Sequence, residues 1–143
     1  MKNKIIIDSA GDIMVLDRTE LSSVPLKIIA GDTEFTDNSL LDVDNMIKFL
    51  KKYKGKVSSA CPSVGDFSET FGDAKNIFVI TITSGLSDSY NSACIAAEAH
   101  KEKYPDRNIF VVDSLSAGPE MLLIAEKIRD LFTETYPLMR LLM

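Results

Sequence analysis

The sequence predicts an α/β fold, with a mostly parallel, doubly wound sheet and helices on both of its faces. Short runs of consecutive apolar residues recur along the chain, and such runs are typical of strands that are buried on both faces. Segments with apolar residues at helical spacing lie between these runs, so that strand and helix alternate. Residues 77–104 show both patterns, joined by a turn rich in serine and glycine.

The first half of the chain contains three expected strands. Residues 4–7 form a short buried strand. Residues 24–29 form a second one, in which Pro25 favours an edge position because proline has no N–H to donate to a neighbouring strand. A turn is expected at residues 30–33. Residues 56–58 form the third strand, which ends in small polar residues.

Two helices are expected beside these strands. The first starts at Asp42 or Ser39, and its apolar residues fall at positions i, i+3, i+4 and i+7, which is one helical face. These apolar residues are Val43, Met46, Ile47 and Leu50. The second helix begins at Ser63, where the sequence through Asp66 resembles a capping box. Phe67 and Phe71, four residues apart, are expected on one face of this second helix.

The second half of the chain contains two units in which a strand, a turn and a helix follow one another. Residues 77–82 are expected to form a buried strand, and the turn at residues 83–87 leads into a helix for which Ser87 is the expected N-cap. Residues 109–112 form the last expected strand. Pro119 suits the first position of the last helix.

Composition limits the classes of function. The length of 143 residues is typical of a single domain, and the 45% of hydrophobic residues is enough to form a core. The net charge of −5 argues against nucleic-acid binding, which needs a basic surface. No leader or membrane-spanning pattern is recognised, so we expect a cytoplasmic protein without stable membrane insertion. Cys61 and Cys94 are expected to be free thiols in a reducing compartment.

We expect residues 1–132 to form one α/β domain. Residues 133–143 are rich in leucine and methionine and too few to form another domain. This stretch is either the end of a final helix or the point at which the chain is cut short of a second domain. In a third interpretation the chain is a fragment that works only in contact with another protein, and the apolar tail is its interface.

Small polar residues follow four of the expected strands. The carboxyl ends of parallel strands share one edge of a sheet, and that edge is where open α/β sheets bind ligands, so we expect these side chains to converge. Hydroxyls, amides and a helix N-terminus can hold a carboxylate, but they supply no catalytic base, so this edge favours binding over catalysis. The four pairs are Asp8-Ser9, Ser58-Ser59, Thr83-Ser84 and Asp113-Ser114.

A metal-dependent enzyme is the alternative. Asp8 and Asp113, with Asp12, would hold Mg²⁺ and act on a small phosphorylated metabolite. A serine hydrolase is not favoured, because the single histidine, His100, lies well inside a helix and is expected to be exposed. The chain also lacks the phosphate-loop and dinucleotide-binding motifs. We therefore expect no catalytic residue, no metal and no cofactor under the binding hypothesis.

Several motifs occur in a fixed order along the chain. They are Ile7-Asp8-Ser9 with Asp12, Pro25-Leu26 with Gly31-Asp32, Ser59 with Cys61-Pro62-Ser63, Thr83-Ser84-Gly85-Leu86-Ser87 with Tyr90, and Val112-Asp113-Ser114 with Ser116-Ala117-Gly118. In this order they resemble the DegV family. Members of this family are fatty-acid-binding proteins that serve as the lipid-carrying subunit of a two-component bacterial fatty acid kinase.

The resemblance implies a long-chain fatty acid whose carboxylate is hydrogen-bonded by hydroxyl groups. By position, it makes Ser59 (threonine in most relatives) and Ser84 the headgroup ligands, together with Ser87 and the Gly85 amide. It also implies a partner, the catalytic subunit of the kinase, to which the carrier presents the carboxylate without itself transferring a phosphoryl group. The second domain of the family, which supplies histidine and arginine near the headgroup, is absent from this sequence.

Overall fold

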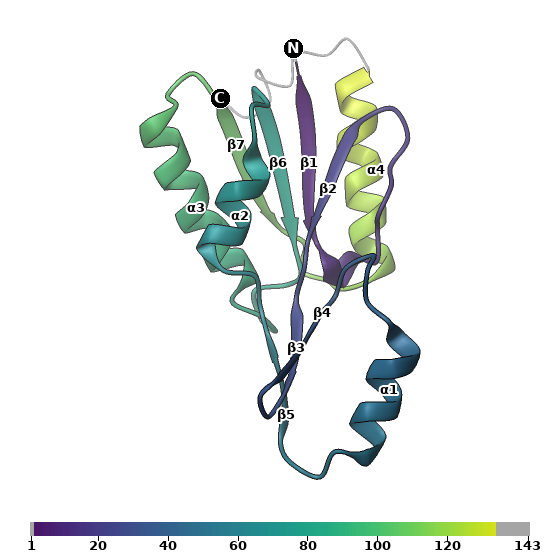
Figure 1. Ribbon diagram of the computed structural model, residues 1–143. Helices are drawn as coiled ribbons and strands as arrows, with labels where there is room; N and C mark the ends of the chain where they lie inside the picture. Colours follow the sequence, from purple (N-terminus) through teal and green to yellow (C-terminus); the bar gives the residue numbers. More distant parts are fainter. Residues whose placement is uncertain (1, 134–143) are drawn as a thin grey trace.

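The computed structural model describes residues 2–133 and consists of two β-sheets and four α-helices within that range (Figure 1). The strands are β1 (Asn3–Asp8), β2 (Glu20–Val24), β3 (Lys27–Ala30), β4 (Thr33–Thr36), β5 (Val57–Ala60), β6 (Asn76–Thr81) and β7 (Asn108–Asp113). The helices are α1 (Val43–Lys52), α2 (Val64–Phe71), α3 (Ser89–Lys103) and α4 (Pro119–Thr133), with a short 3₁₀ helix at Ser9–Gly11. Most of the expected tail, residues 134–143, lies outside the described residues.

The larger sheet has the strand order β2-β1-β6-β7, and all of its strands are parallel. This sheet confirms the fold class that the sequence predicts. The smaller sheet has the order β4-β3-β5, and both of its pairings are antiparallel. Figure 1 shows the smaller sheet below the larger one, with α1 beside it. The sequence did not predict this second sheet.

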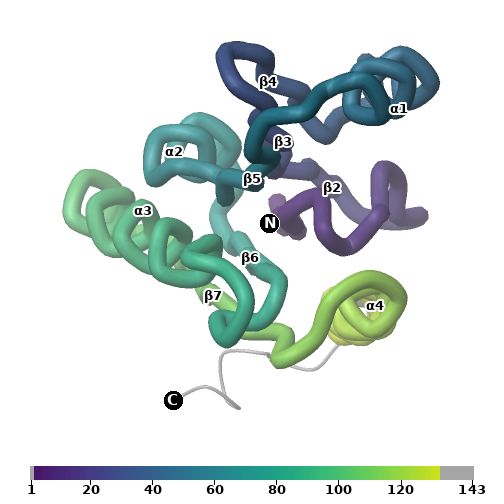
Figure 2. Tube along the Cα trace, turned by 90° about the horizontal axis from the view of Figure 1, so that it is seen from below, coloured from purple at the N-terminus to yellow at the C-terminus, as the bar shows by residue number. Residues whose placement is uncertain are grey.

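The side chains of β1 divide the core between the two faces of the parallel sheet. Ile6 packs with residues of α2 and α3, whereas Ile5 and Ile7 pack with residues of α4. All three isoleucines are fully buried, and they alternate because successive side chains of a strand point to opposite faces. Figures 1 and 2 show α2 and α3 on one face and α4 on the other, so the expected helices on both faces are present.

Residues 24–29, predicted as one strand, are divided between the two sheets. β2 ends at Val24, β3 begins at Lys27, and Pro25 lies in the break. Proline has no N–H for a ladder, and the amide of Leu26 leaves both ladders to donate to Ser9 Oγ at 3.0 Å. β2 is an edge strand as expected, but β3 lies in the middle of the small sheet. The prediction of a single strand was therefore wrong.

The starts of α1 and α2 follow the expected capping chemistry. The Asp42 side chain accepts a hydrogen bond from the Asn45 amide at 2.9 Å, so α1 is capped by Asp42 and not by Ser39. At the start of α2, Ser63 Oγ accepts from the Asp66 amide at 3.1 Å, and Asp66 Oδ2 accepts from the Ser63 amide at 2.7 Å. This capping box was predicted, and it holds the pKa of Asp66 below its usual value. No helix within residues 2–133 is long and apolar enough to span a bilayer.

Candidate functional site

Three of the four expected polar strand ends meet at the carboxyl edge of the parallel sheet. β6 lies between β1 and β7, with Ile7 opposite Ile80 and Thr81 opposite Asp113. The chain leaves β6 through residues 82–88, here called the Ser84 loop, and then enters α3 at Ser89. The Ser84 loop therefore has the end of β1 on one side and the end of β7 on the other.

Asp8, the last residue of β1, holds both ends of the Ser84 loop. Its Oδ2 accepts hydrogen bonds from the Ile82 amide at 2.8 Å and from Ser89 Oγ at 2.7 Å. The Asp8 side chain is fully buried, and burial raises its pKa above the usual value, although the bonds from Ser89 and Ile82 act in the opposite direction. Asp8 thus fixes where the loop leaves the sheet and where it enters α3.

The raised pKa of Asp8 leads to an expected pH dependence of stability. Between the ordinary carboxyl value of 3.8 and the raised value, the folded state binds more protons than the unfolded state. The stabilising effect of protonation is therefore fully present below pH 3.8 and is lost as the pH rises through the folded pKa. Urea unfolding of wild type and Asp8→Asn across this range would measure it. The stability of the wild type relative to the variant should fall with rising pH, and a rise would contradict the assignment.

Ser84 lies exposed in the loop and is bonded to Asp113. Ser84 Oγ donates to Asp113 Oδ2 at 2.5 Å, and the Ser84 amide donates to Asp113 Oδ1 at 3.1 Å. The Leu115 amide also donates to Oδ1, at 3.1 Å. These donors, the Ser84 hydroxyl first among them, hold the pKa of Asp113 below its usual value. The structure therefore brings together two residues that the sequence placed on separate strand ends.

The other two expected ligands of the loop form local hydrogen bonds. The Gly85 amide donates to Thr83 Oγ1 at 3.3 Å, and Ser87 Oγ accepts from the Ser89 amide at 3.2 Å. The prediction of Ser87 as the N-cap was wrong by one position: Asp88 is the residue before α3, and its side chain accepts no capping hydrogen bond. That the Gly85 amide and Ser87 contact the ligand stays a prediction.

Ser59 occupies a different sheet from the one that was predicted. It lies exposed on β5, which pairs antiparallel with β3, so the expectation that β5 ends at the edge of the parallel sheet was wrong. Ser59 is opposite Ile28, two residues after Leu26, whose amide is bonded to Ser9 at the end of β1. The small sheet is thus joined to the same edge. That Ser59 and Ser84 contact one ligand stays a prediction.

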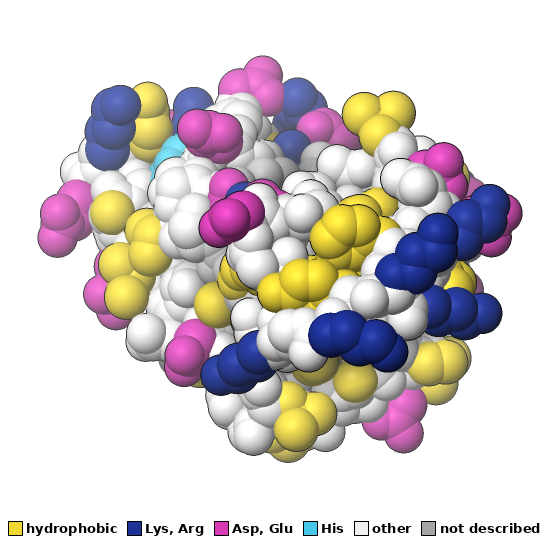
Figure 3. Space-filling model, turned by 60° about the horizontal axis from the view of Figure 1, so that its bottom comes forward, with side chains coloured by type: hydrophobic (Ala, Val, Ile, Leu, Met, Phe, Trp, Pro, Cys, Tyr) yellow, Lys and Arg dark blue, Asp and Glu magenta, His cyan; other side chains and the backbone are white. Residues whose placement is uncertain are grey.

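Apolar side chains lie in solvent beside the Ser84–Asp113 pair. Leu86 and Leu115 each lie two residues after a member of the pair, and they are 75% and 80% exposed. Leu115 also has a φ of 55°, a left-handed conformation that is uncommon for a bulky residue and is often found at functional sites. On the face of the molecule that Figure 3 shows, hydrophobic side chains lie beside several lysine or arginine side chains.

The metal-dependent alternative is not supported by the arrangement of its carboxylates. Asp8 is buried and engaged by Ile82 and Ser89, and Asp113 is engaged by Ser84. In the described part of the chain, no group of three or more histidine, cysteine, aspartate or glutamate side chains is arranged to hold a metal ion.

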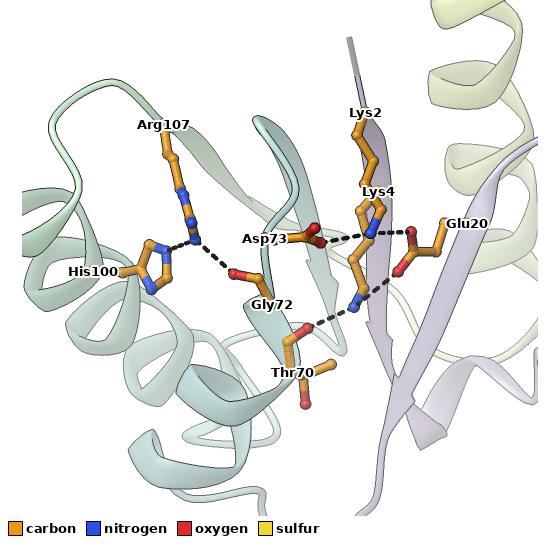
Figure 4. A network of polar contacts seen from close by, with 8 residues as sticks. All are labelled: Lys2, Lys4, Glu20, Thr70, Gly72, Asp73, His100 and Arg107. Atoms are coloured by element: carbon orange, nitrogen blue, oxygen red, sulfur yellow. Dashed lines mark hydrogen bonds and ion pairs between the residues drawn. The ribbon is translucent and has the colours of Figure 1, made fainter.

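His100 lies at the other end of α3 from the Ser84 loop. It is eleven residues after Ser89, about 16 Å along a helix that rises about 1.5 Å per residue. Arg107 Nη1 lies 3.1 Å from His100 Nε2 and donates to the Gly72 carbonyl at 2.6 Å (Figure 4). The expectation that His100 is exposed was wrong: it is half-buried, and burial lowers its pKa, with the charge of Arg107 acting in the same direction.

Sequence reasoning missed two contributions to the site. Ser89 was read as part of a helix, but its hydroxyl is fully buried against Asp8. Asp113 was expected near Ser84 as a polar strand end and was considered as a metal ligand, but its hydrogen bonds from Ser84 were not predicted. The sequence did carry a signal, because β1 and β7 each end in an aspartate. An aspartate at a strand end can accept hydrogen bonds from the amides of the next loop.

Comparison with known proteins places these motifs in one family. The model of the family described as "Uncharacterised protein, DegV family COG1307" matches residues 2–136. A DegV domain-containing protein of Streptococcus pneumoniae is 44% identical over 135 residues, which are 92% of this chain and 48% of the relative. One from Streptococcus pyogenes is 40% identical over 128 residues, 86% of this chain and 46% of the relative. The chain spans about half the length of the curated relatives it matches.

Two solved structures have a closely similar fold. A DegV family protein from Eubacterium eligens, loaded with heptadecanoic acid, has 38% sequence identity and a TM-score of 0.92, covering 96% of this chain and 50% of that one. The fatty acid kinase B3 protein of Streptococcus pneumoniae, loaded with linoleic acid, has 42% identity and a TM-score of 0.89, covering 95% and 50%. Both similar proteins are described with a bound fatty acid.

Proposed function

The chain belongs to the DegV family, and from that premise we propose that it forms the headgroup-binding part of a fatty-acid carrier. Its ligand is a long-chain fatty acid, whose carboxylate is hydrogen-bonded by Ser84 and Ser59. The observation that carries the proposal is the exposed Ser84 hydroxyl at the carboxyl edge of the sheet, with exposed Leu86 and Leu115 beside it. A polar donor next to apolar surface suits a molecule that has one charged end and one apolar chain.

The proposal extends to a partner. One similar structure is named as a fatty acid kinase B3 protein, and this name supports the proposal that the carrier presents its carboxylate to a kinase catalytic subunit. The chain itself transfers no phosphoryl group under this proposal. The kinase partner and the cytoplasmic location both stay predictions. Because the relatives are longer, we also propose that a second domain completes the site and encloses the acyl chain.

Native mass spectrometry of the chain purified from bacterial cells tests the proposal directly. We expect an added mass that corresponds to one long-chain fatty acid, or uptake of one equivalent of linoleate when it is supplied. The same measurement is made on this chain extended by the second half of a close relative. Binding by the extended protein alone would show that the headgroup site is present and that the shorter chain lacks only the part that encloses the acyl chain. If neither protein carries or takes up a fatty acid, the proposed function is wrong.

Replacing Ser84 with alanine should weaken linoleate binding by about 1–3 kcal/mol, because the headgroup loses a hydrogen bond to a charged group. Isothermal titration calorimetry with linoleate below its micelle concentration would measure the change. Ser68→Ala is the matched control, since Ser68 is an exposed serine on α2 and lies outside the Ser84 loop. Equal affinities of Ser84→Ala and Ser68→Ala would remove Ser84 from the site.

A further inference from the structure

Both hydrogen-bond donors of Ser84 are used by one carboxylate. The hydroxyl donates to one oxygen of Asp113 and the amide donates to the other, at 2.5 and 3.1 Å. A serine hydroxyl has a single proton to donate, so Ser84 offers only lone pairs to an incoming group in this arrangement. A hydrogen bond from a hydroxyl to an ionised carboxylate is also among the stronger hydrogen bonds of proteins.

An ionised fatty acid needs the hydrogen-bond donors of Ser84 that Asp113 already occupies. A carboxylate only accepts hydrogen bonds, so it can use Ser84 only when the hydroxyl turns away from Asp113. The ligand headgroup would then lie beside a second negative charge, which opposes its binding. The side chain of Asp113 therefore has the same chemistry as the headgroup and is bound by the donors that the headgroup would use.

Asp113 is held in this position by its surroundings. It is the last residue of β7 and is paired with Thr81 of β6, and its Oδ1 also accepts the Leu115 amide. The ion pairs formed among residues 2–133 involve other carboxylates, so no cation in that range neutralises Asp113. The pKa of Asp113 is lowered, with the Ser84 hydroxyl as the largest cause, so the group carries its charge at neutral pH.

From this geometry we propose that Asp113 is an internal competitor of the fatty acid carboxylate for Ser84. The inference rests on the proposed function and adds to it a residue that limits the affinity of the site. A carrier that must give up its headgroup to a second protein benefits from such a competitor, because Asp113 takes back the Ser84 donors as the ligand leaves. In this role Asp113 acts through Ser84 and is a positioning residue.

Asp113→Asn tests the competition. Asparagine keeps one acceptor oxygen for the loop amides but loses the charge that strengthens the hydrogen bond from the Ser84 hydroxyl, so this hydroxyl is released more easily to the ligand, and we expect linoleate to bind about tenfold more tightly. Glu98→Gln is the matched control, because Glu98 is an exposed carboxylate on α3 outside the Ser84 loop and its loss changes the net charge equally. Affinities are measured by calorimetry on the protein that takes up linoleate.

A double variant separates competition from a general structural effect. In the Ser84→Ala background, Asp113→Asn should lose most of its tenfold gain, because the donors for which Asp113 competes include the missing hydroxyl. Carbon-13 NMR of carboxyl-labelled linoleate gives a second readout: the pKa of the bound headgroup should be lower in Asp113→Asn than in wild type, since a neighbouring negative charge is gone.

The outcomes distinguish this inference from the function on which it rests. If wild type binds linoleate and Asp113→Asn binds it no more tightly than Glu98→Gln does, the competition is wrong and the proposed function stands. A gain that is unchanged in the Ser84→Ala background also overturns the competition. If neither wild type nor Asp113→Asn takes up linoleate, even when extended by a second domain, the proposed function fails and this inference fails with it.

Discussion

Replacing Phe67 with alanine is expected to lower the free energy of unfolding by about 3–5 kcal/mol, the usual cost of removing a buried phenylalanine ring. Phe67 is fully buried in the layer between the parallel sheet and helices α2 and α3. It packs there among Ile6 of β1, Phe71 of α2 and Ala96 of α3. Because these neighbours belong to three different elements, they cannot close together over the missing ring without moving strand or helix backbone.

The higher helix propensity of alanine opposes the expected loss of stability in Phe67→Ala. A measured loss is therefore a stricter test of core packing. Alanine is a better helix former than phenylalanine, so the exchange favours α2 locally while it empties the core. Leu123→Ala is the matched control, because Leu123 is also helical, in α4, but 64% exposed. Urea unfolding should show less than about 0.5 kcal/mol of change for this control. A similar, small change for Phe67→Ala would show that the α2 layer is not a close-packed core.

The parts of the fold that were predicted depend on local patterns. β6 is buried on both faces, and residues 77–80 are all apolar, so the sequence alone predicts a central strand. The capping box at Ser63 and Asp66 needs only residues three apart, and it formed as predicted. Phe67 and Phe71 are likewise both buried, because their spacing of four places them on one helical face.

The small sheet was not predicted, because its strands carry no clear pattern of burial. In β5 the residues Val57, Ser58 and Ser59 are all exposed, so no alternation marks an inner face. Its partner β3 is separated from β2 only by Pro25 and Leu26. Because apolar residues stand on both sides of this proline, the pattern predicts one continuous strand. What divides them is the bond from the Leu26 amide to Ser9, a contact across 17 positions that sequence periodicity cannot reveal.

The convergence of three polar strand ends was predicted, but the hydrogen bonds among them were not. Parallel strand ends share an edge, so Asp8, Ser84 and Asp113 were expected at the same place, and the structure confirms it. Which polar group donates to which depends on register, here Thr81 opposite Asp113 across β6 and β7. A shift of one residue would turn the Asp113 side chain to the other face of the sheet. Composition and spacing along the chain carry no information on that register.

Asp8→Ala is expected to destabilise the protein by about 2–4 kcal/mol, because it leaves two buried donors, the Ile82 amide and the Ser89 hydroxyl, without an acceptor. The burial that raises the pKa of Asp8 makes the charged group costly, so the loss stays below the sum of two full hydrogen bonds to a charge. Urea unfolding measures this loss of stability. Glu98→Ala is the control, since Glu98 is an exposed acidic residue on α3.

The same change should also affect ligand binding, because Asp8 fixes both ends of the Ser84 loop. With its two anchors released, the loop samples more conformations, and the Ser84 donors spend less time aligned at the edge of the sheet. Hydrogen exchange of the amides in residues 82–88 should therefore accelerate more than that of α2, and linoleate affinity should fall even under conditions where the variant remains folded. Asp8→Asn keeps one acceptor oxygen and should restore part of both properties. If Asp8→Ala loses stability while the exchange of the loop stays unchanged, then Asp8 supports the core alone and the position of Ser84 depends on Asp113.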